Sequence, residues 1–170
     1  MKKITTILIS LLMFVTATGA TIDSEKIALK ELVDTFSILA DKKDTKTQSF
    51  LFTKNATLKS YHGNDLMSEY TGRENIEKAC AKFLALFSTV YHINGQQTVE
   101  LIDKNTAKGI AYCQVVLIGK DENGKNIMTT QGIWYEDEYK KENGKWLISN
   151  RTSHFVWTDK KLIITKNELS

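Results

Sequence analysis

Hydrophobic and polar positions follow a helical period in the first half of the chain and a period of two in the second half. Apolar residues after Asp23 and Ser24 recur three or four positions apart, which predicts a helix of about five turns. Either of these two residues is suited to be its N-cap. The apolar positions are Ile27, Leu29, Leu32, Val33, Phe36, Leu39 and Ala40.

Between this helix and residue 88, the pattern predicts a short helix, a hairpin and a second amphipathic helix. Asp44 caps the short helix, which carries Phe50, Leu51 and Phe52. The hairpin has one strand at about 56–61, a turn at 62–65 and a second strand that ends at Tyr70. The second amphipathic helix follows Gly72, and its apolar stripe contains Ile76, Cys80, Phe83 and Phe87.

From Ser88 onward, apolar and polar residues alternate, as in strands with one buried face. The alternation predicts four long strands, at about 89–102, 107–119, 127–141 and 145–157. Turn residues separate them, including two Asn-Gly pairs, which are strong hairpin signals. The chain has no proline to interrupt the ladders. Helices followed by such a meander predict an α+β domain with the helices on one face of a curved antiparallel sheet.

The first 20 residues have the layout of a secretory signal peptide. They contain two lysines, the apolar run Ile7–Val15 and small residues up to Ala20. The apolar run is too short to span a bilayer. We therefore expect residues 21–170 to form a single domain that is exported to the periplasm or secreted, with no membrane contact after processing.

The net charge argues against a nucleic-acid partner. The sequence of 170 residues has 23 Lys and Arg against 20 Asp and Glu, a net charge of +3. Two lysines and no acid leave with the expected signal peptide, so +1 remains. A domain this close to neutral has no basic excess with which to attract nucleic acid.

Histidines and cysteines show no metal-binding pattern. His62, His92 and His154 lack the spacing of metal ligands, and none lies near a cysteine in the sequence, so neither a metal nor a cofactor is expected. Cys80 and Cys113 are the only cysteines. They either pair in an oxidising compartment or serve as small buried hydrophobic residues.

Several short motifs stand in order along the chain: Phe36-Ser-Ile-Leu-Ala-Asp41, Leu51-Phe52-Thr-Lys-Asn55-Ala56, Gly72-Arg73-Glu74-Asn75-Ile76, Tyr91-His92-Ile93-Asn94, Tyr135-Glu136-Asp137-Glu138, and Asn143-Gly144-Lys145-Trp146-Leu147-Ile148 with Arg151. Over about residues 25–157 they resemble the SnoaL-like branch of the nuclear transport factor 2-like superfamily, which includes scytalone dehydratase and ketosteroid isomerase relatives. The resemblance implies a cone-shaped α+β fold, in which a strongly curved antiparallel sheet wraps around a pocket and N-terminal helices pack on it.

The resemblance places an acid–base pair at Asp41 and His92. An imidazole titrates near neutral pH, and a carboxylate orients it and stabilises its charged form. Such a pair is able to remove a proton beside a carbonyl and return it to a leaving hydroxyl. Alternatively, Asp41 is a solvated residue at the helix end, and His92 is a strand residue whose imidazole only forms a hydrogen bond with a neighbouring side chain.

The motifs also depart from those of the family's dehydratases. Phe36 stands where these often have a tyrosine, and the position of a second pocket histidine aligns near Leu117. Both departures remove a group that polarises a substrate carbonyl. Tyr61 or Tyr135 is the candidate replacement donor.

The remaining pocket candidates lie on the expected strands. Asn94 shares the face of His92 because side chains two apart point the same way. Arg151 either pairs with Asp137 or binds an anionic ligand group through its two-pronged donor geometry. His154 is opposite in phase to Arg151, and we expect it to be non-catalytic.

Three hypotheses for function remain open. The first is an exported dehydratase or isomerase that acts on a small, largely apolar substrate through Asp41 and His92. The second is a non-catalytic domain that binds a small hydrophobic or weakly anionic molecule, and the third is a dimerising interaction domain. A homodimer is expected in any case, because aromatic residues on the outer face of the sheet need cover and relatives commonly pair through their sheets.

Overall fold

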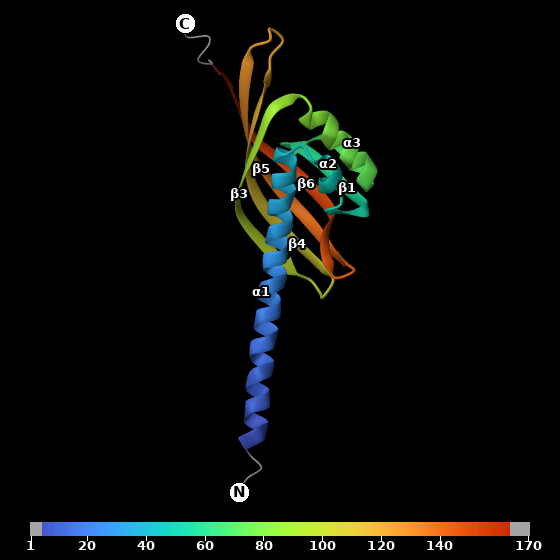
Figure 1. Cartoon of the computed structure of the whole chain (residues 1–170), viewed down its shortest axis with the longest axis vertical. Helices are drawn as coiled ribbons and strands as arrows, with labels where there is room; N and C mark the ends of the chain where they lie inside the picture. Colours follow the sequence, from blue (N-terminus) through green and yellow to red (C-terminus); the bar gives the residue numbers. More distant parts are fainter. Residues whose placement is uncertain (1–4, 164–170) are drawn as a thin grey trace.

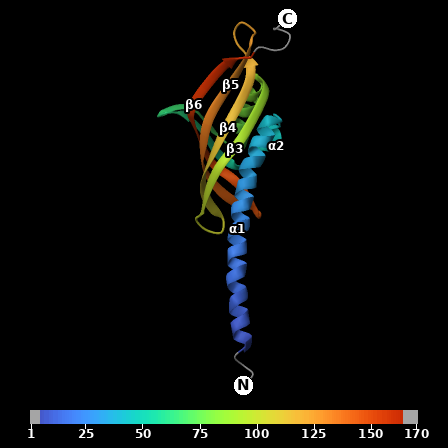
Figure 2. The same ribbon diagram turned by 90° about the vertical axis from the view of Figure 1, so that its left-hand side faces the viewer.

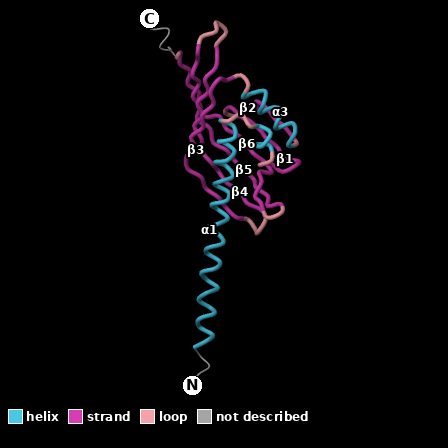
Figure 3. Tube along the Cα trace, viewed as in Figure 1, coloured by secondary structure: helices cyan, strands magenta, loops and turns pink. Residues whose placement is uncertain are grey.

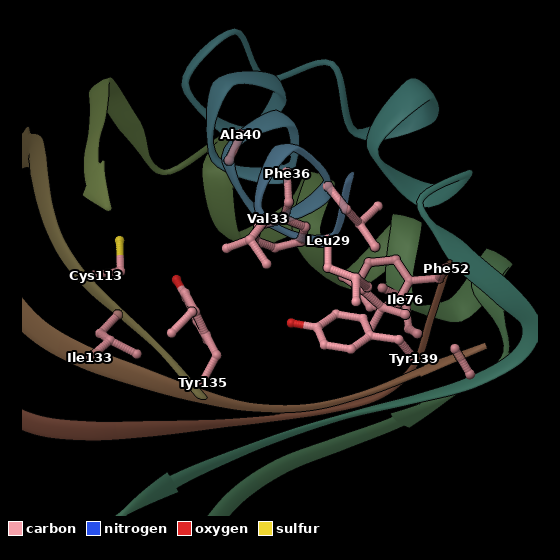
Figure 4. Close-up of a cluster of buried hydrophobic side chains, with 14 of the residues drawn as sticks. Leu29, Val33, Phe36, Ala40, Phe52, Ile76, Cys113, Ile133, Tyr135 and Tyr139 are labelled. Carbon is pink, nitrogen blue, oxygen red and sulfur yellow. The ribbon is translucent and has the colours of Figure 1, made fainter. Parts of the chain in front are cut away.

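The first helix presents the predicted apolar stripe to the sheet. In the computed structural model, α1 (Thr5–Asp41) buries Leu29, Val33 and Phe36. These positions lie three or four apart and so share one face of the helix. Figure 4 shows all three beside the strands of the curved sheet. The C-terminal half of α1 is therefore fixed by hydrophobic packing, as the periodicity predicts.

The structure describes residues 5–163, and the first helix is longer than expected. Its backbone is already helical at Thr5, so neither Asp23 nor Ser24 begins it, and the N-cap prediction is wrong. The N-terminal part of α1 extends beyond the sheet (Figure 1). Residues 1–4 of the expected signal peptide and 164–170 of the expected C-terminal tail lie outside the described residues. No helix in the part of the chain that the structure describes is long and apolar enough to cross a membrane.

The segment after α1 contains the predicted short elements with shifted boundaries. Asp44 caps α2 as expected, since its side chain accepts a hydrogen bond from the Thr47 amide at 3.0 Å. Phe52 is not part of this helix but begins a strand, because it is fully buried there under the core. The elements are α2 (Thr45–Ser49), β1 (Phe52–His62), β2 (Asp65–Thr71) and α3 (Arg73–Leu84).

The second half of the chain forms the predicted meander. Its strands are β3 (Phe87–Leu101), β4 (Thr106–Lys120), β5 (Asn126–Glu142) and β6 (Lys145–Leu162). The sheet order is β2-β1-β6-β5-β4-β3. Every neighbouring pair is antiparallel except β1 and β6, which are parallel. The sheet is therefore mixed, and the prediction of a fully antiparallel sheet is wrong in this respect. Turn residues in the sequence indicate only antiparallel hairpins, whereas β1 and β6 pair although most of the chain separates them.

The helices lie on one face of the curved sheet (Figures 2 and 3). Buried hydrophobic side chains fill the space between the helices and the sheet (Figure 4). Along β4, Ala111, Cys113 and Val115 are buried, whereas Tyr112 between them is 45% exposed. Alternate residues of each strand therefore point either into the concave core or to the convex outer face. This alternation decides which candidate residues reach the site.

Candidate functional site

Asp41 and His92 meet where α1 ends above β3. His92 Nδ1 lies 2.6 Å from Asp41 Oδ1, and the His92 backbone amide donates to Asp41 Oδ2 at 3.2 Å. The His92 side chain is 9% exposed and that of Asp41 26%. Tyr91 and Ile93, on either side of His92, are exposed on the outer face. The pair therefore forms the contact that the motifs predict, on the concave face of the sheet.

The contact with Asp41 assigns a tautomer to His92. With the carboxylate of Asp41 as the acceptor, the shared proton is assigned to Nδ1. This leaves the lone pair of Nε2 free, with no hydrogen-bond partner among the described residues. Burial lowers the pKa of His92 and outweighs the opposing influence of Asp41. At neutral pH the imidazole is then a neutral, oriented base.

His92 faces a small cavity of about 130 Å³ inside the cone. Phe36 and Tyr135 line it, as the sequence analysis expects, and Phe36 packs on Tyr135 at 6.3 Å between ring centroids. Leu117 also lies in the wall and offers no polar group. The cavity is therefore mainly apolar around one imidazole, which favours a small apolar ligand.

Tyr135 is the phenol that the cavity offers as a hydrogen-bond donor. Its side chain is buried, and burial raises its pKa far above the usual range. The hydroxyl lies beside the Cys113 thiol, with which it hydrogen-bonds. Of the two replacement donors considered from the sequence, Tyr135 is the one in the cavity wall.

Tyr61 lies on the opposite face of the sheet. Its ring stacks on His154 at 5.9 Å, and His154 stacks on Trp134 at 3.8 Å. These three residues stand side by side on adjacent strands of the convex face. Tyr61 is therefore absent from the lining of the cavity that holds His92. His154 is likewise remote from the cavity.

Asn94 shares the face of His92 but is covered by α1. Ser37 Oγ donates to Asn94 Oδ1 at 2.9 Å, and Asn94 Nδ2 donates to Asp34 Oδ1 at 2.9 Å. Its amide is thus occupied at both ends by the helix that carries Asp41. Asn94 fastens α1 to β3 next to the Asp41–His92 contact.

Asp137 and Arg151 form a buried ion pair under the cavity. Arg151 Nε and Nη2 donate to the two carboxylate oxygens at 2.7 and 2.6 Å, and the Tyr139 hydroxyl donates to Asp137 at 2.8 Å. The guanidinium also lies 4.3 Å from the Phe36 ring and 4.2 Å from the Tyr135 ring. The pair supports two cavity-lining rings from below and is not itself in the lining.

Sequence reasoning did not assign α3 to the cavity. Cys80, Phe83 and Leu84 of this helix close one side of it. The sequence pattern placed Cys80 and Phe83 on one apolar stripe without linking that stripe to a cavity, and Phe83 is 46% exposed. The hydrogen bond from Gln48 Nε2 to the Phe36 carbonyl, at 2.9 Å, was also beyond the sequence pattern.

The cysteines are not disulfide-bonded, and their thiols are not nucleophiles. Cys80 and Cys113 are both free. Burial raises the pKa of each to about 11, so both remain protonated at neutral pH. Within residues 5–163, no cluster of three or more His, Cys, Asp or Glu side chains forms a metal site.

Solved structures from other proteins share this architecture. A proposed scytalone dehydratase from Novosphingobium aromaticivorans has a TM-score of 0.73 and 18% identity, covering 86% of this chain and 94% of its own. A type 2 hexachlorocyclohexane dehydrochlorinase, LinA, has a TM-score of 0.69 and 15% identity, with 83% and 91% covered. The Kfla4162 protein from Kribbella flavida has a TM-score of 0.72 and 15% identity, with 81% and 94% covered.

These structural likenesses show the cone fold. Among curated proteins, no match to the sequence was found. The model of the SnoaL-like domain matches residues 24–152, which is most of the chain and contains the Asp41–His92 pair, the ion pair and most of the cavity wall. The chain belongs to the SnoaL-like family, and its fold is that of the nuclear transport factor 2-like superfamily.

Proposed function

We propose that this protein is a lyase or isomerase in which His92 takes a proton from a carbon atom of a small, largely apolar substrate. One observation carries the proposal: the imidazole faces an apolar cavity with Nε2 free, while Asp41 holds Nδ1. A neutral imidazole with this orientation is a general base at neutral pH. The names of two structural relatives, a dehydratase and a dehydrochlorinase, support an elimination.

For a β-hydroxy ketone, the balanced reaction is the loss of water. Nε2 of His92 removes a proton from the carbon between the carbonyl and the hydroxyl-bearing carbon. The released electron pair forms the carbon–carbon double bond as the C–O bond breaks, and the imidazolium returns its proton to the departing oxygen. Asp41 stabilises the imidazolium in between. Tyr135 is the donor to the carbonyl oxygen in this scheme.

The test follows the conversion of 3-hydroxycyclohexanone to 2-cyclohexenone by ultraviolet absorbance. His92→Ala is expected to lower kcat/KM by about 10²–10⁴-fold, the usual contribution of a general base. His154→Ala is the matched control, because this histidine lies on the opposite face of the sheet. Equal turnover by wild type and His92→Ala contradicts the proposal. If the wild type binds this ketone without converting it, the second candidate function, a ligand-binding domain, is favoured. Phe36 and Leu117 support this second candidate because neither side chain offers a polar group to the substrate.

Export is part of the proposal and rests on the layout of residues 1–20. N-terminal sequencing of the protein from its own host is expected to begin at or near Thr21. Retention of Met1 contradicts it.

A further inference from the structure

A second hollow lies next to the cavity of His92. Its volume is about 390 Å³, against about 130 Å³ for the inner one. Both hollows are lined by the same six residues: Leu58, Ser60, Cys80, Phe83, Gln131 and Phe155. The two hollows are therefore adjacent, with these six side chains lying between an inner and an outer chamber.

The outer chamber lies between α3 and the β1–β2 hairpin. Ala79 of α3 lines it on one side, and Met67 and Tyr70 of β2 on the other. Figures 1 and 3 show α3 beside β1 and β2. Ala79 is absent from the lining of the inner chamber, so a larger side chain at this position changes the outer chamber alone.

The walls of the outer chamber carry no Asp, Glu, Lys or Arg. At its rim three large apolar side chains are exposed, namely Met67 at 66%, Phe83 at 46% and Tyr70 at 38%. The Cys80 thiol between the two chambers stays protonated and contributes an apolar surface. His62 is the one titratable side chain besides Cys80 and Tyr70 in this wall. A wall without acidic side chains, Lys or Arg and with an apolar rim favours an apolar ligand group over a charged one.

We propose that the outer chamber binds an apolar tail of the substrate, so that the substrate is elongated, with a small polar head beside His92 and an alkyl or aryl tail between α3 and the hairpin. The inner chamber alone accommodates only the head. The tail enters last and lies nearest the solvent, at the rim of Met67, Tyr70 and Phe83. The position of the head rests on the proposed function, whereas the position of the tail rests on the adjacency of the two chambers, which share six lining residues.

The test measures binding of phenol, 4-propylphenol and 4-hexylphenol by isothermal titration calorimetry. The phenol hydroxyl is a donor that suits the lone pair of His92 Nε2. With a tail subsite, affinity is expected to rise about fourfold for each methylene that leaves water. Binding of one ligand per chain is part of the expected result. An affinity that does not increase with tail length overturns the proposal.

Ala79→Phe fills the outer chamber and is expected to abolish the gain from the tail while leaving phenol affinity unchanged. Ala81→Phe is the matched control on the same helix, because Ala81 is exposed and lines neither chamber. Ala79→Leu, a smaller change, is expected to reduce the gain in part, and thermal melts check the fold of each variant. An equal gain from the tail in Ala79→Phe, Ala79→Leu and Ala81→Phe overturns the tail subsite.

His92→Ala separates this inference from the proposed function. In that variant the affinity for phenol is expected to fall, while the increase per methylene persists. If Ala79→Phe no longer gains affinity with tail length while His92→Ala binds phenol as well as the wild type does, the tail subsite is supported and the role of His92 is contradicted. If Ala79→Phe keeps the gain while His92→Ala binds phenol more weakly, the tail subsite is overturned and the role of His92 is supported.

Discussion

At the scale of single residues, the protonation of His92 links the site to stability. Burial lowers the pKa of His92 in the folded protein, whereas in the unfolded chain it lies near 6.5. The unfolded state therefore binds the proton more readily, and this contribution to stability is complete above pH 6.5 and lost as the pH falls below it. We expect the free energy of unfolding of the wild type to decrease between pH 7 and pH 5.

Urea unfolding of His92→Gln over the same pH range checks this prediction. The variant lacks the titrating group, so its stability is expected to depend less on pH than that of the wild type. His62→Gln is the control, because His62 is exposed. A pH dependence that His92→Gln leaves unaltered contradicts the assignment of a lowered pKa to His92.

The ion pair of Asp137 and Arg151 allows a second prediction at this scale. Both side chains are fully buried, so Arg151→Met leaves a carboxylate without its counter-charge. A loss of roughly 3–5 kcal/mol in the free energy of unfolding is expected. Denaturant titration is the measurement, and Lys108→Met, which breaks an exposed pair with Glu100, is expected to cost less than about 1 kcal/mol.

The double variant Asp137→Leu with Arg151→Met distinguishes pairing from packing. With both charges removed, no buried ion remains unpaired, and much of the lost stability is expected to return. A double variant no more stable than Arg151→Met would show that the guanidinium acts through its contacts with Phe36 and Tyr135 instead.

The candidate site was only partly predictable from individual residues. The contact of Asp41 with His92 was expected because the motifs that contain these two residues resemble those of the family. Tyr61 lies outside the cavity because Leu58 and Ser60 face inward, so the alternation of β1 turns Tyr61 outward. Asn94 was placed on the correct face, but the sequence could not show that α1 covers it.

At the scale of elements, Gly109 of β4 leaves no room for a side chain beside β3. A Cβ atom there would lie 2.6 Å from the Thr98 carbonyl oxygen, which belongs to the backbone of β3. Gly109→Ala is therefore expected to push the strands apart and to cost about 1–3 kcal/mol, as overpacked positions do. Chemical denaturation measures the loss.

Gly95→Ala on β3 is the matched control. A Cβ at that position would make only ordinary contacts with Tyr112, the nearest at 3.5 Å. Its effect on stability is expected to remain below about 1 kcal/mol. Equal losses of unfolding free energy in Gly109→Ala and Gly95→Ala would contradict the prediction that contact with β3 requires glycine at position 109.

The elements were predictable where a local signal marks them. Alternation and the Asn-Gly turns located the meander, and Asp44 located the start of α2. The parallel pairing of β1 with β6 has no such signal, since it joins segments far apart in the sequence. For the same reason, the periodicity of α3 did not reveal that its apolar stripe closes a cavity.

At the scale of the whole molecule, the convex face of the sheet exposes large apolar residues. Tyr91, Ile93, Tyr112 and Trp157 are each 44–54% exposed, and the last three line one shallow hollow. We predict that two copies of the chain cover this face in a homodimer. Light scattering coupled to gel filtration at high micromolar concentration is expected to give twice the mass of the chain.

Tyr112→Glu is expected to shift the protein to the monomer, because it places a charge in the covered face. Ile38→Glu, at an exposed position of α1, is the control and is expected to leave the mass unchanged. A monomeric wild type at high micromolar concentration contradicts this prediction.

Asp41 holds His92 as a neutral base with a free Nε2. Long-range ¹H–¹⁵N correlation spectra of the protein labelled at histidine nitrogens report this state directly. We expect a neutral imidazole at pH 7 with its proton on Nδ1 and a pKa below 6.5, lowered further in Asp41→Asn. A proton on Nε2, or a pKa above 6.5, would contradict it.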